Sequence, residues 1–213
     1  MSRSTIQNRL KLFLGYKQNA LIVAVSLFGI FILSAALYSS SMSKKIDHAA
    51  YTSLLTTVAK GESNGNYNAY FSAPANTAPK LTDMTIAEVL DWQTRFVADG
   101  NASNAAGRYQ IIQPTLEGLV KELNIAPTAR FDEQLQDRFA IALMERRGSE
   151  AFIEKRISAE QFAASLAKEW AALPNVVGDK PTESFYAGDG LNQSRVSVDA
   201  IMDAVGEFKE AAN

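Results

Sequence analysis

Glu62 is the residue whose type and position most clearly suggest chemistry. It lies 11 positions after Tyr51, and at about 100° per residue a helix brings these two positions to within about 20° of each other. The carboxylate therefore continues an apolar stripe that includes Leu54, Leu55 and Val58. Desolvation on such a face raises the pKa of a carboxyl group, so that it can donate a proton to a leaving oxygen. The alternative is a helix end that frays and releases this side chain to water.

Two segments near Glu62 combine aromatic, amide and hydroxyl side chains. They are residues 62–70 (ESNGNYNAY) and residues 103–112 (SNAAGRYQII). Aromatic faces and planar amide or hydroxyl groups are suited to binding sugars. Gly107 allows a close approach of the backbone to a ligand. We therefore expect a sugar-binding groove with these substrate contacts: Ser63, Tyr70, Arg108, Tyr109, Gln110 and, from a glycine-rich stretch, Tyr186.

The composition excludes several other classes of function. The chain has no cysteine and one histidine, His48, so disulfides, thiolate nucleophiles and a two-histidine zinc site are excluded, and we expect no metal and no cofactor. After residue 43 the chain carries 17 basic and 23 acidic residues. This acidic balance disfavours nucleic-acid binding, which needs a basic surface for phosphates.

The N-terminal region predicts a membrane anchor. Residues 20–37 form a run of 18 residues without charge, close to the roughly 20 needed to span a bilayer as a helix. More basic residues precede the run than follow it, which places the N-terminus in the cytoplasm. We expect a cytoplasmic tail at 1–19, a single-pass anchor at 20–38, a linker at 39–46 and a domain at 47–213 on the periplasmic or wall side. A cleaved signal peptide and a buried core helix are the alternatives.

Capping residues and apolar spacing place the helices of the domain. Six helix starts are marked by residues typical of that position: Asp47, Thr85 with Glu88, Pro114, Asp132, Ser158 with Gln161, and Ser197. The predicted helices run at 47–61, 85–97, 114–123, 132–147, 158–173 and 197–208. Short strands are expected only between residues 64 and 113. The predicted fold class is α+β: a mainly helical domain with a small looped or β-containing lobe after its first helix.

Three blocks of the domain resemble the phage lambda-type endolysins. They are Glu62-Ser63 after an amphipathic helix, residues 106–111 (AGRYQI) and residues 170–174 (WAALP). Residues 84–90 and 184–190 are also similar to that broader group, and the resemblance covers roughly residues 52–205. It implies a lysozyme-like fold and a lytic transglycosylase that cleaves peptidoglycan glycan strands. The lambda-type enzymes lack the predicted anchor.

The resemblance implies that Glu62 is a single catalytic carboxylate. Glu62 would protonate the oxygen between N-acetylmuramic acid and N-acetylglucosamine, then deprotonate the C6 hydroxyl of muramic acid to give a 1,6-anhydro ring. The alternatives are a two-carboxylate muramidase that hydrolyses the same bond and a non-catalytic wall-binding scaffold. We expect the nearby carboxylates Asp83, Asp91 and Asp99 to be structural.

The other candidates also have structural alternatives. Tyr109 and Gln110 could be buried core residues and Tyr186 could fill a turn, while Arg108 is equally suited to an ion pair and to binding a muramyl carboxylate or peptide. The sequence leaves the biological setting open between a phage, including its virion, and a conjugation or secretion machine.

Overall fold

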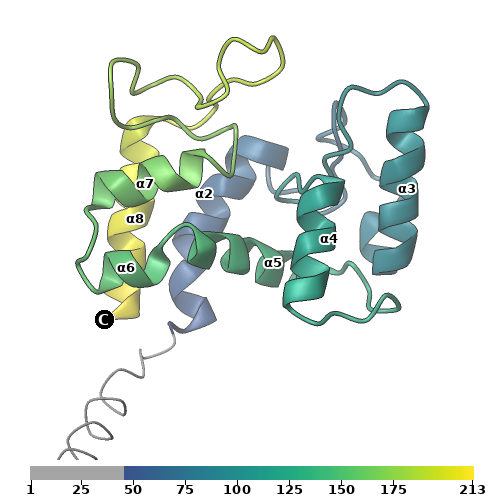
Figure 1. Ribbon diagram of the computed structural model, residues 1–213, viewed down its shortest axis with the longest axis horizontal. Helices are drawn as coiled ribbons and strands as arrows, with labels where there is room; N and C mark the ends of the chain where they lie inside the picture. Colours follow the sequence, from purple (N-terminus) through teal and green to yellow (C-terminus); the bar gives the residue numbers. More distant parts are fainter. Residues whose placement is uncertain (1–45) are drawn as a thin grey trace, which may run out of the picture. The chain divides into compact units, whose positions relative to one another are not determined.

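The computed structural model describes residues 46–213, and the regular secondary structure of that part is helical (Figure 1). The predicted tail and anchor lie outside the described residues, as does nearly all of the linker. No helix within residues 46–213 is long and apolar enough to cross a membrane. The described helices are η1 (His48–Tyr51), α2 (Thr52–Ser63), η2 (Leu81–Asp83), α3 (Ile86–Ala98), α4 (Gln113–Glu122), α5 (Glu133–Arg146), α6 (Ser149–Ile153), α7 (Ala159–Ala167) and α8 (Val198–Ala212).

The predicted capping residues begin the helices as expected. Thr85 and Glu88 form a complete capping box at α3, and Ser158 and Gln161 form another at α7. Each box satisfies two backbone N–H groups that have no partner inside the helix. The remaining predicted caps also accept a backbone hydrogen bond at the start of their helix: Asp47, Asp132 and Ser197.

One predicted helix is too long, and one observed helix is not predicted. The helix expected at 158–173 ends at Ala167, and Trp170 and Leu173 are buried from the irregular segment that follows. Their apolar spacing reflects burial in the core rather than a continuing helix. The helix that is not predicted is α6, whose N-cap Gly148, at a φ of 106°, comes two residues after the last residue of α5.

The lobe that follows α2 is looped and not β-structured. Residues 64–113 contain isolated β-bridges but no strand, so the α+β expectation is corrected to a helical fold with a looped lobe. The loops of this lobe are joined by hydrogen bonds from asparagine side chains to backbone groups, where a sheet would have backbone hydrogen bonds between strands. Asn66 Nδ2 donates to the carbonyls of Pro74 and Asn76 at 2.9 and 2.8 Å, and Asn68 Oδ1 accepts from the N–H of Thr82 at 3.0 Å.

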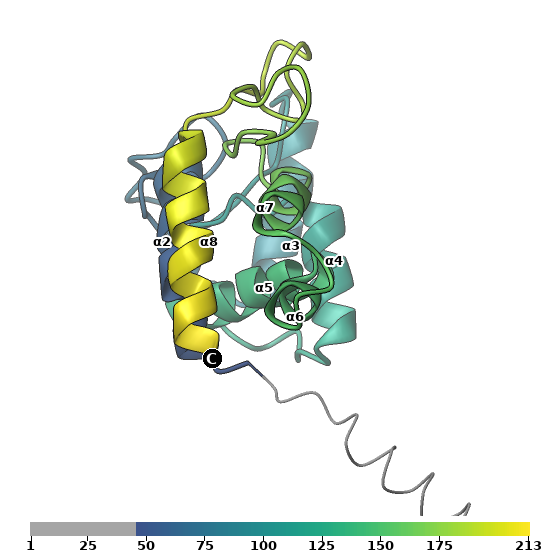
Figure 2. The same cartoon turned by 90° about the vertical axis from the view of Figure 1, so that its left-hand side faces the viewer.

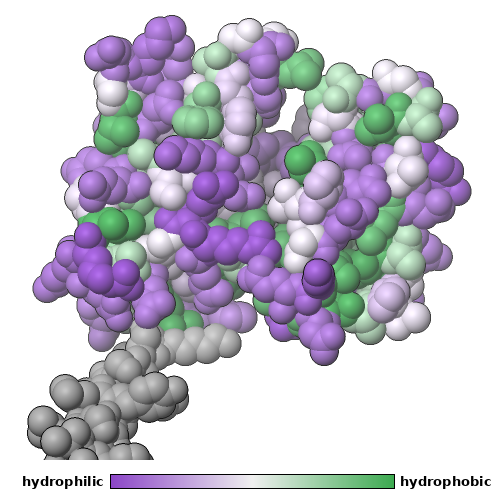
Figure 3. All heavy atoms as spheres, in the orientation of Figure 1, coloured by the Kyte–Doolittle hydropathy of each residue, from purple (hydrophilic) through white to green (hydrophobic). Residues whose placement is uncertain are grey.

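Helix α2 buries one face in the domain and exposes Thr52, Thr56 and Lys60 on the other. It packs along α8 and also contacts α5, and the pairing of α2 with α8 is clear in Figure 2. Helices α3 and α4 pack together on one side, while α6, α7 and α8 form the other (Figure 1). Between these two groups the surface is hollowed (Figure 3). The C-terminal end of α2, which carries Glu62, faces this hollow.

Candidate active site

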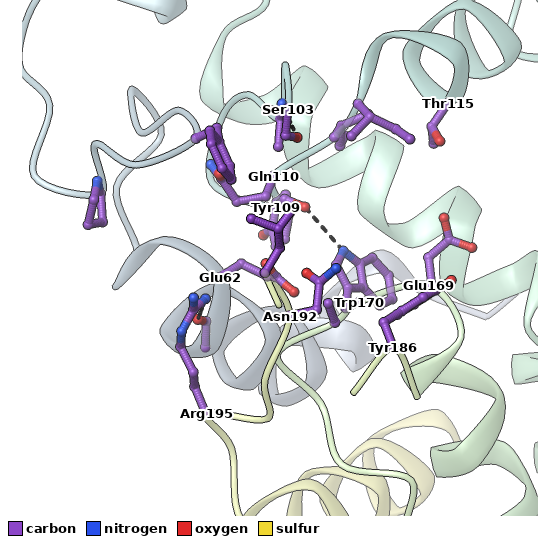
Figure 4. A pocket seen from close by; sticks show the side chains of 18 of the residues that line it. Glu62, Ser103, Tyr109, Gln110, Thr115, Glu169, Trp170, Tyr186, Asn192 and Arg195 are labelled. Carbon is purple, nitrogen blue, oxygen red and sulfur yellow. Dashed lines mark hydrogen bonds between the residues drawn. The ribbon is translucent and has the colours of Figure 1, made fainter. Parts of the chain in front are cut away.

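A cleft of about 950 Å³ lies between the two groups of helices. Its walls come from the end of α2, from the looped lobe, from α4 and α5, and from the segment between α7 and α8. Figure 4 shows polar and aromatic side chains from these elements facing a common space. Of the predicted site residues, five line the cleft: Glu62, Tyr70, Tyr109, Gln110 and Tyr186.

Glu62 lies in the last turn of α2, which continues through Ser63 and does not stop at Gly61 as expected. The backbone N–H of Ala172 donates to Glu62 Oε1 at 3.0 Å. Burial raises the pKa of Glu62, and the bond from Ala172 and the charge of Arg195 offset part of that rise. The direction agrees with that expected from the position of Glu62 on the apolar stripe.

Gly61 allows the chain to approach Glu62 closely. A Cβ at this position would lie 2.8 Å from Val196 Cγ2 and 2.9 Å from Ala172 Cβ. Both distances are shorter than an ordinary van der Waals contact, so only glycine fits without a shift of the neighbours. The packing of Ala172 against α2 is what brings its N–H to the carboxylate.

The aromatic and amide walls are held by bonds within the protein. Tyr109 is buried, and its hydroxyl donates to Asp137 Oδ1 at 2.6 Å. Gln110 has a φ of 47°, and its Nε2 donates to the carbonyl of Gly107 at 2.8 Å. The Tyr186 hydroxyl donates to the carbonyl of Lys168 at 2.7 Å. These walls are therefore positioned before any ligand arrives.

Tyr70 forms its part of the wall with aromatic support from α3. Its ring meets Trp92 and Phe96 edge-on, with centroids 5.3 Å away in each case. Trp92 and Phe96 stack on each other at 4.8 Å. This cluster fixes the plane of a ring that lines the cleft. Trp92 itself is not among the residues that line it.

Ser63 and Arg108, both predicted to bind substrate, are not among the residues that line the cleft. Ser63 Oγ donates to the carbonyl of Arg108 at 2.7 Å, which ties the end of α2 to the looped lobe. The Arg108 guanidinium bonds to the Tyr67 hydroxyl and lies 3.5 Å from Asp137. The structure therefore gives both side chains structural contacts, because their polar groups point into the protein.

Five charged residues that line the cleft are not among the predicted site residues: Lys60, Arg147, Lys168, Glu169 and Arg195. Glu169 directly precedes the block at residues 170–174 that resembles the endolysins, so its place in the sequence is a usable signal. Its carboxylate accepts from Arg147 Nε at 2.8 Å and lies 2.7 Å from Arg147 Nη2. Arg195 lies in an irregular segment without periodicity, and nothing in the sequence marked it.

The carboxylates predicted to be structural are not among the residues that line the cleft. Asp83 pairs with Arg130 at 3.9 Å, and Asp91 pairs with Arg95 at 3.0 Å within α3. Asp99 caps the C-terminal end of the same helix. In the described part of the chain, no group of three or more acidic or histidine side chains could hold a metal ion.

Comparison with known proteins assigns the family. A search of curated proteins finds no match. Among solved structures, bacteriophage lambda lysozyme complexed with a chitohexasaccharide is similar at 20% identity and a TM-score of 0.48, over 79% of this chain and 96% of that one. The model of the Endolysin family matches residues 82–188, just over half of the chain. That segment includes Tyr109, Gln110 and Tyr186 and begins after Glu62. The chain belongs to the Endolysin family.

Proposed function

We propose that this protein is a peptidoglycan lytic transglycosylase in which Glu62 acts first as an acid and then as a base. Membership of the Endolysin family supports a peptidoglycan-cleaving, lysozyme-like enzyme. The observation that carries the narrower proposal is the state of the two carboxylates in the cleft. Among the described residues, Glu62 forms no ion pair and has a raised pKa, whereas Glu169 is neutralised by Arg147.

The proposed reaction needs only one proton-carrying group. Burial keeps Glu62 protonated closer to neutral pH, and the bond from Ala172 occupies Oε1, so Oε2 is the oxygen free to deliver the proton. That proton passes to the glycosidic oxygen as its bond to C1 of muramic acid breaks. The carboxylate then takes the proton of the C6 hydroxyl while the C6 oxygen bonds to C1. The 1,6-anhydro ring closes, Glu62 is protonated again and no water is consumed.

A muramidase is the second candidate, because Glu169 lines the same cleft. Hydrolysis in most glycosidases uses a second carboxylate as the nucleophile or as the base for water. The ion pair with Arg147 occupies one of the oxygens of Glu169. A free carboxylate would suit that second role better, and this favours the transglycosylase. A non-catalytic scaffold would not require a raised pKa at Glu62.

We propose that residues 20–38 anchor the enzyme in the membrane, with the domain at 47–213 on the periplasmic or wall side. The support is the uncharged run at 20–37 and the excess of basic residues before it. Such an anchor would restrict cutting to wall close to the membrane. A phage, including its virion, and a conjugation or secretion machine would each have a use for that restriction.

The chemical nature of the products tests the reaction. Purified full-length protein is incubated with peptidoglycan, and the released muropeptides are weighed by mass spectrometry. The expected products end in 1,6-anhydromuramic acid, which is lighter than a reducing muramic acid end by one water. Reducing ends as the main product would replace this proposal by the muramidase.

A further inference from the structure

We propose that Arg195 forms a carboxylate-binding subsite beside Glu62, which makes the cleft select acidic glycan strands over neutral ones. The inference rests on the proposed function and identifies the carboxylate as the part of the substrate that the cleft recognises. Figure 4 shows Arg195 reaching to the end of α2 that carries Glu62. A ligand bound against Glu62 therefore has this guanidinium within reach.

Most of the hydrogen-bonding capacity of Arg195 is unused within the described residues. A guanidinium has five N–H donors, and in residues 46–213 only Nη1 is engaged, in a long bond of 3.4 Å to the carbonyl of Gly61. No carboxylate of that part of the chain forms an ion pair with it. Arginine is suited to this task because its planar fork matches both oxygens of a carboxylate.

The charge of the cleft is opposite to that of the domain around it. Residues 46–213 carry 15 basic and 23 acidic side chains, a net charge of −8. The residues that line the cleft nevertheless include two acidic residues, Glu62 and Glu169, and the four basic residues Lys60, Arg147, Lys168 and Arg195. The positive cleft attracts anionic ligands, whereas the acidic surface of the rest of the domain repels them.

The acidic group of the ligand is a carboxylate. In a glycan strand stripped of peptides it is the lactyl carboxylate of muramic acid, whereas in an intact strand that group is an amide and the peptide supplies the carboxylates. Arg108, expected from the sequence to bind this group, is occupied by Tyr67 and Asp137. Arg195 is the arginine of the cleft that forms no ion pair among the described residues, and its charge acts on Glu62 from beyond ion-pair distance.

Binding is tested in the full-length chain carrying Glu62→Gln, so that the ligand is not cut and no effect on the protonation of Glu62 enters. The ligands are chitohexaose, which is neutral, a muramic acid strand stripped of peptides, and a strand with its peptides. The expected result is tighter binding of the acidic strands. Adding Arg195→Gln should weaken that binding about tenfold, as for a hydrogen bond to a charged group, and leave chitohexaose binding within about twofold. The two acidic strands distinguish the lactyl carboxylate from the peptide carboxylates.

Arg138→Gln is the matched control. Arg138 is exposed on α5, is not among the residues that line the cleft, and has no ion pair among the described residues. Equal weakening of all three ligands by Arg195→Gln, or the same selective loss in Arg138→Gln, would overturn the subsite. Failure of the proposed function has a different signature: the protein with Glu62 intact would not cleave peptidoglycan, or would leave reducing muramic acid ends, whatever its preference among these ligands.

Discussion

The backbone N–H of Ala172 donates to the carboxylate of Glu62 across a sequence separation of 110 residues. One partner lies at the end of a helix and the other in the irregular segment before α8. Their contact joins the two sides of the cleft at the group that we propose does the chemistry. It also leaves one carboxylate oxygen free, which a general acid requires.

Replacing Glu62 by Gln is expected to lower the rate of glycan cleavage by about 100-fold or more, since the amide cannot supply the proton. The fold should persist, because the amide oxygen can still accept the bond from Ala172. Release of soluble muropeptides measures the rate, and circular dichroism measures the fold. Near-normal cleavage by the well-folded variant would remove Glu62 from the mechanism.

The same substitution should change how stability depends on pH. The pKa of Glu62 is raised by burial above its ordinary value of 4.5, so the folded state holds this proton more tightly than the unfolded state. The resulting stabilisation is fully present below that value and is lost as pH rises through the folded pKa. As the pH is raised, the melting temperature of the Gln variant should therefore increase relative to that of the unaltered protein. A constant difference across pH would contradict the raised pKa.

Helix starts, the apolar stripe and the position of Glu62 could be predicted because they depend on local rules. Thr85 with Glu88 and Ser158 with Gln161 illustrate this, since each cap uses residues three apart. Contacts between distant segments could not be predicted in this way. The pairing of Ser63 with the carbonyl of Arg108 depends on how the looped lobe folds back onto α2, and single-sequence periodicity carries no information about it.

Arg195 and Arg108 show the same limit within the site. Arg108 lies in a block that resembles a family motif, and it was predicted to bind substrate. The looped lobe turns its side chain toward Tyr67 and Asp137 instead. Arg195 reaches the cleft because its segment packs against Gly61, and no sequence pattern predicts this contact.

Gly61→Ala is expected to lower the free energy of unfolding by about 1–3 kcal/mol, because the added methyl group overlaps Ala172 and Val196. It should also lower activity, since relief of the overlap moves the N–H of Ala172 away from Glu62. Urea unfolding and cleavage rates measure the two effects. Gly118→Ala in α4 is the control: it has open space around it, and helix propensity predicts unchanged or slightly higher stability. Equal behaviour of the two variants would contradict the close approach at Gly61.

Ser63→Ala separates a structural role from substrate binding. The substitution leaves the carbonyl of Arg108 without its partner, and we expect a loss of about 1–2 kcal/mol in the free energy of unfolding. KM should stay within about twofold, because Ser63 is not among the residues that line the cleft. A several-fold rise in KM at unchanged stability would instead indicate that Ser63 contacts the substrate.

The full-length chain is expected to sediment with membranes and to be released by detergent but not by high salt or alkaline carbonate. The reason is the uncharged run at 20–37, whose burial in lipid is insensitive to ionic strength. Immunoblotting of fractions measures this, and N-terminal sequencing of the same material shows whether the chain is cut. A free protein whose N-terminus lies near residue 37 or 42 would identify a cleaved signal peptide instead.

Glu169→Gln decides between the two reaction types. If Glu62 works alone, loss of this carboxylate should leave most of the activity, and the products should still end in 1,6-anhydromuramic acid. Some loss of stability is expected, because Arg147 is left without its partner in a partly buried ion pair. The double variant Glu169→Gln with Arg147→Gln controls for that uncompensated charge, and its stability should match or exceed that of the single variant. A hydrolase would behave differently on both counts: each folded variant would be inactive, and the unaltered protein would leave reducing muramic acid ends, with Glu169 then acting as the second carboxylate across the sugar.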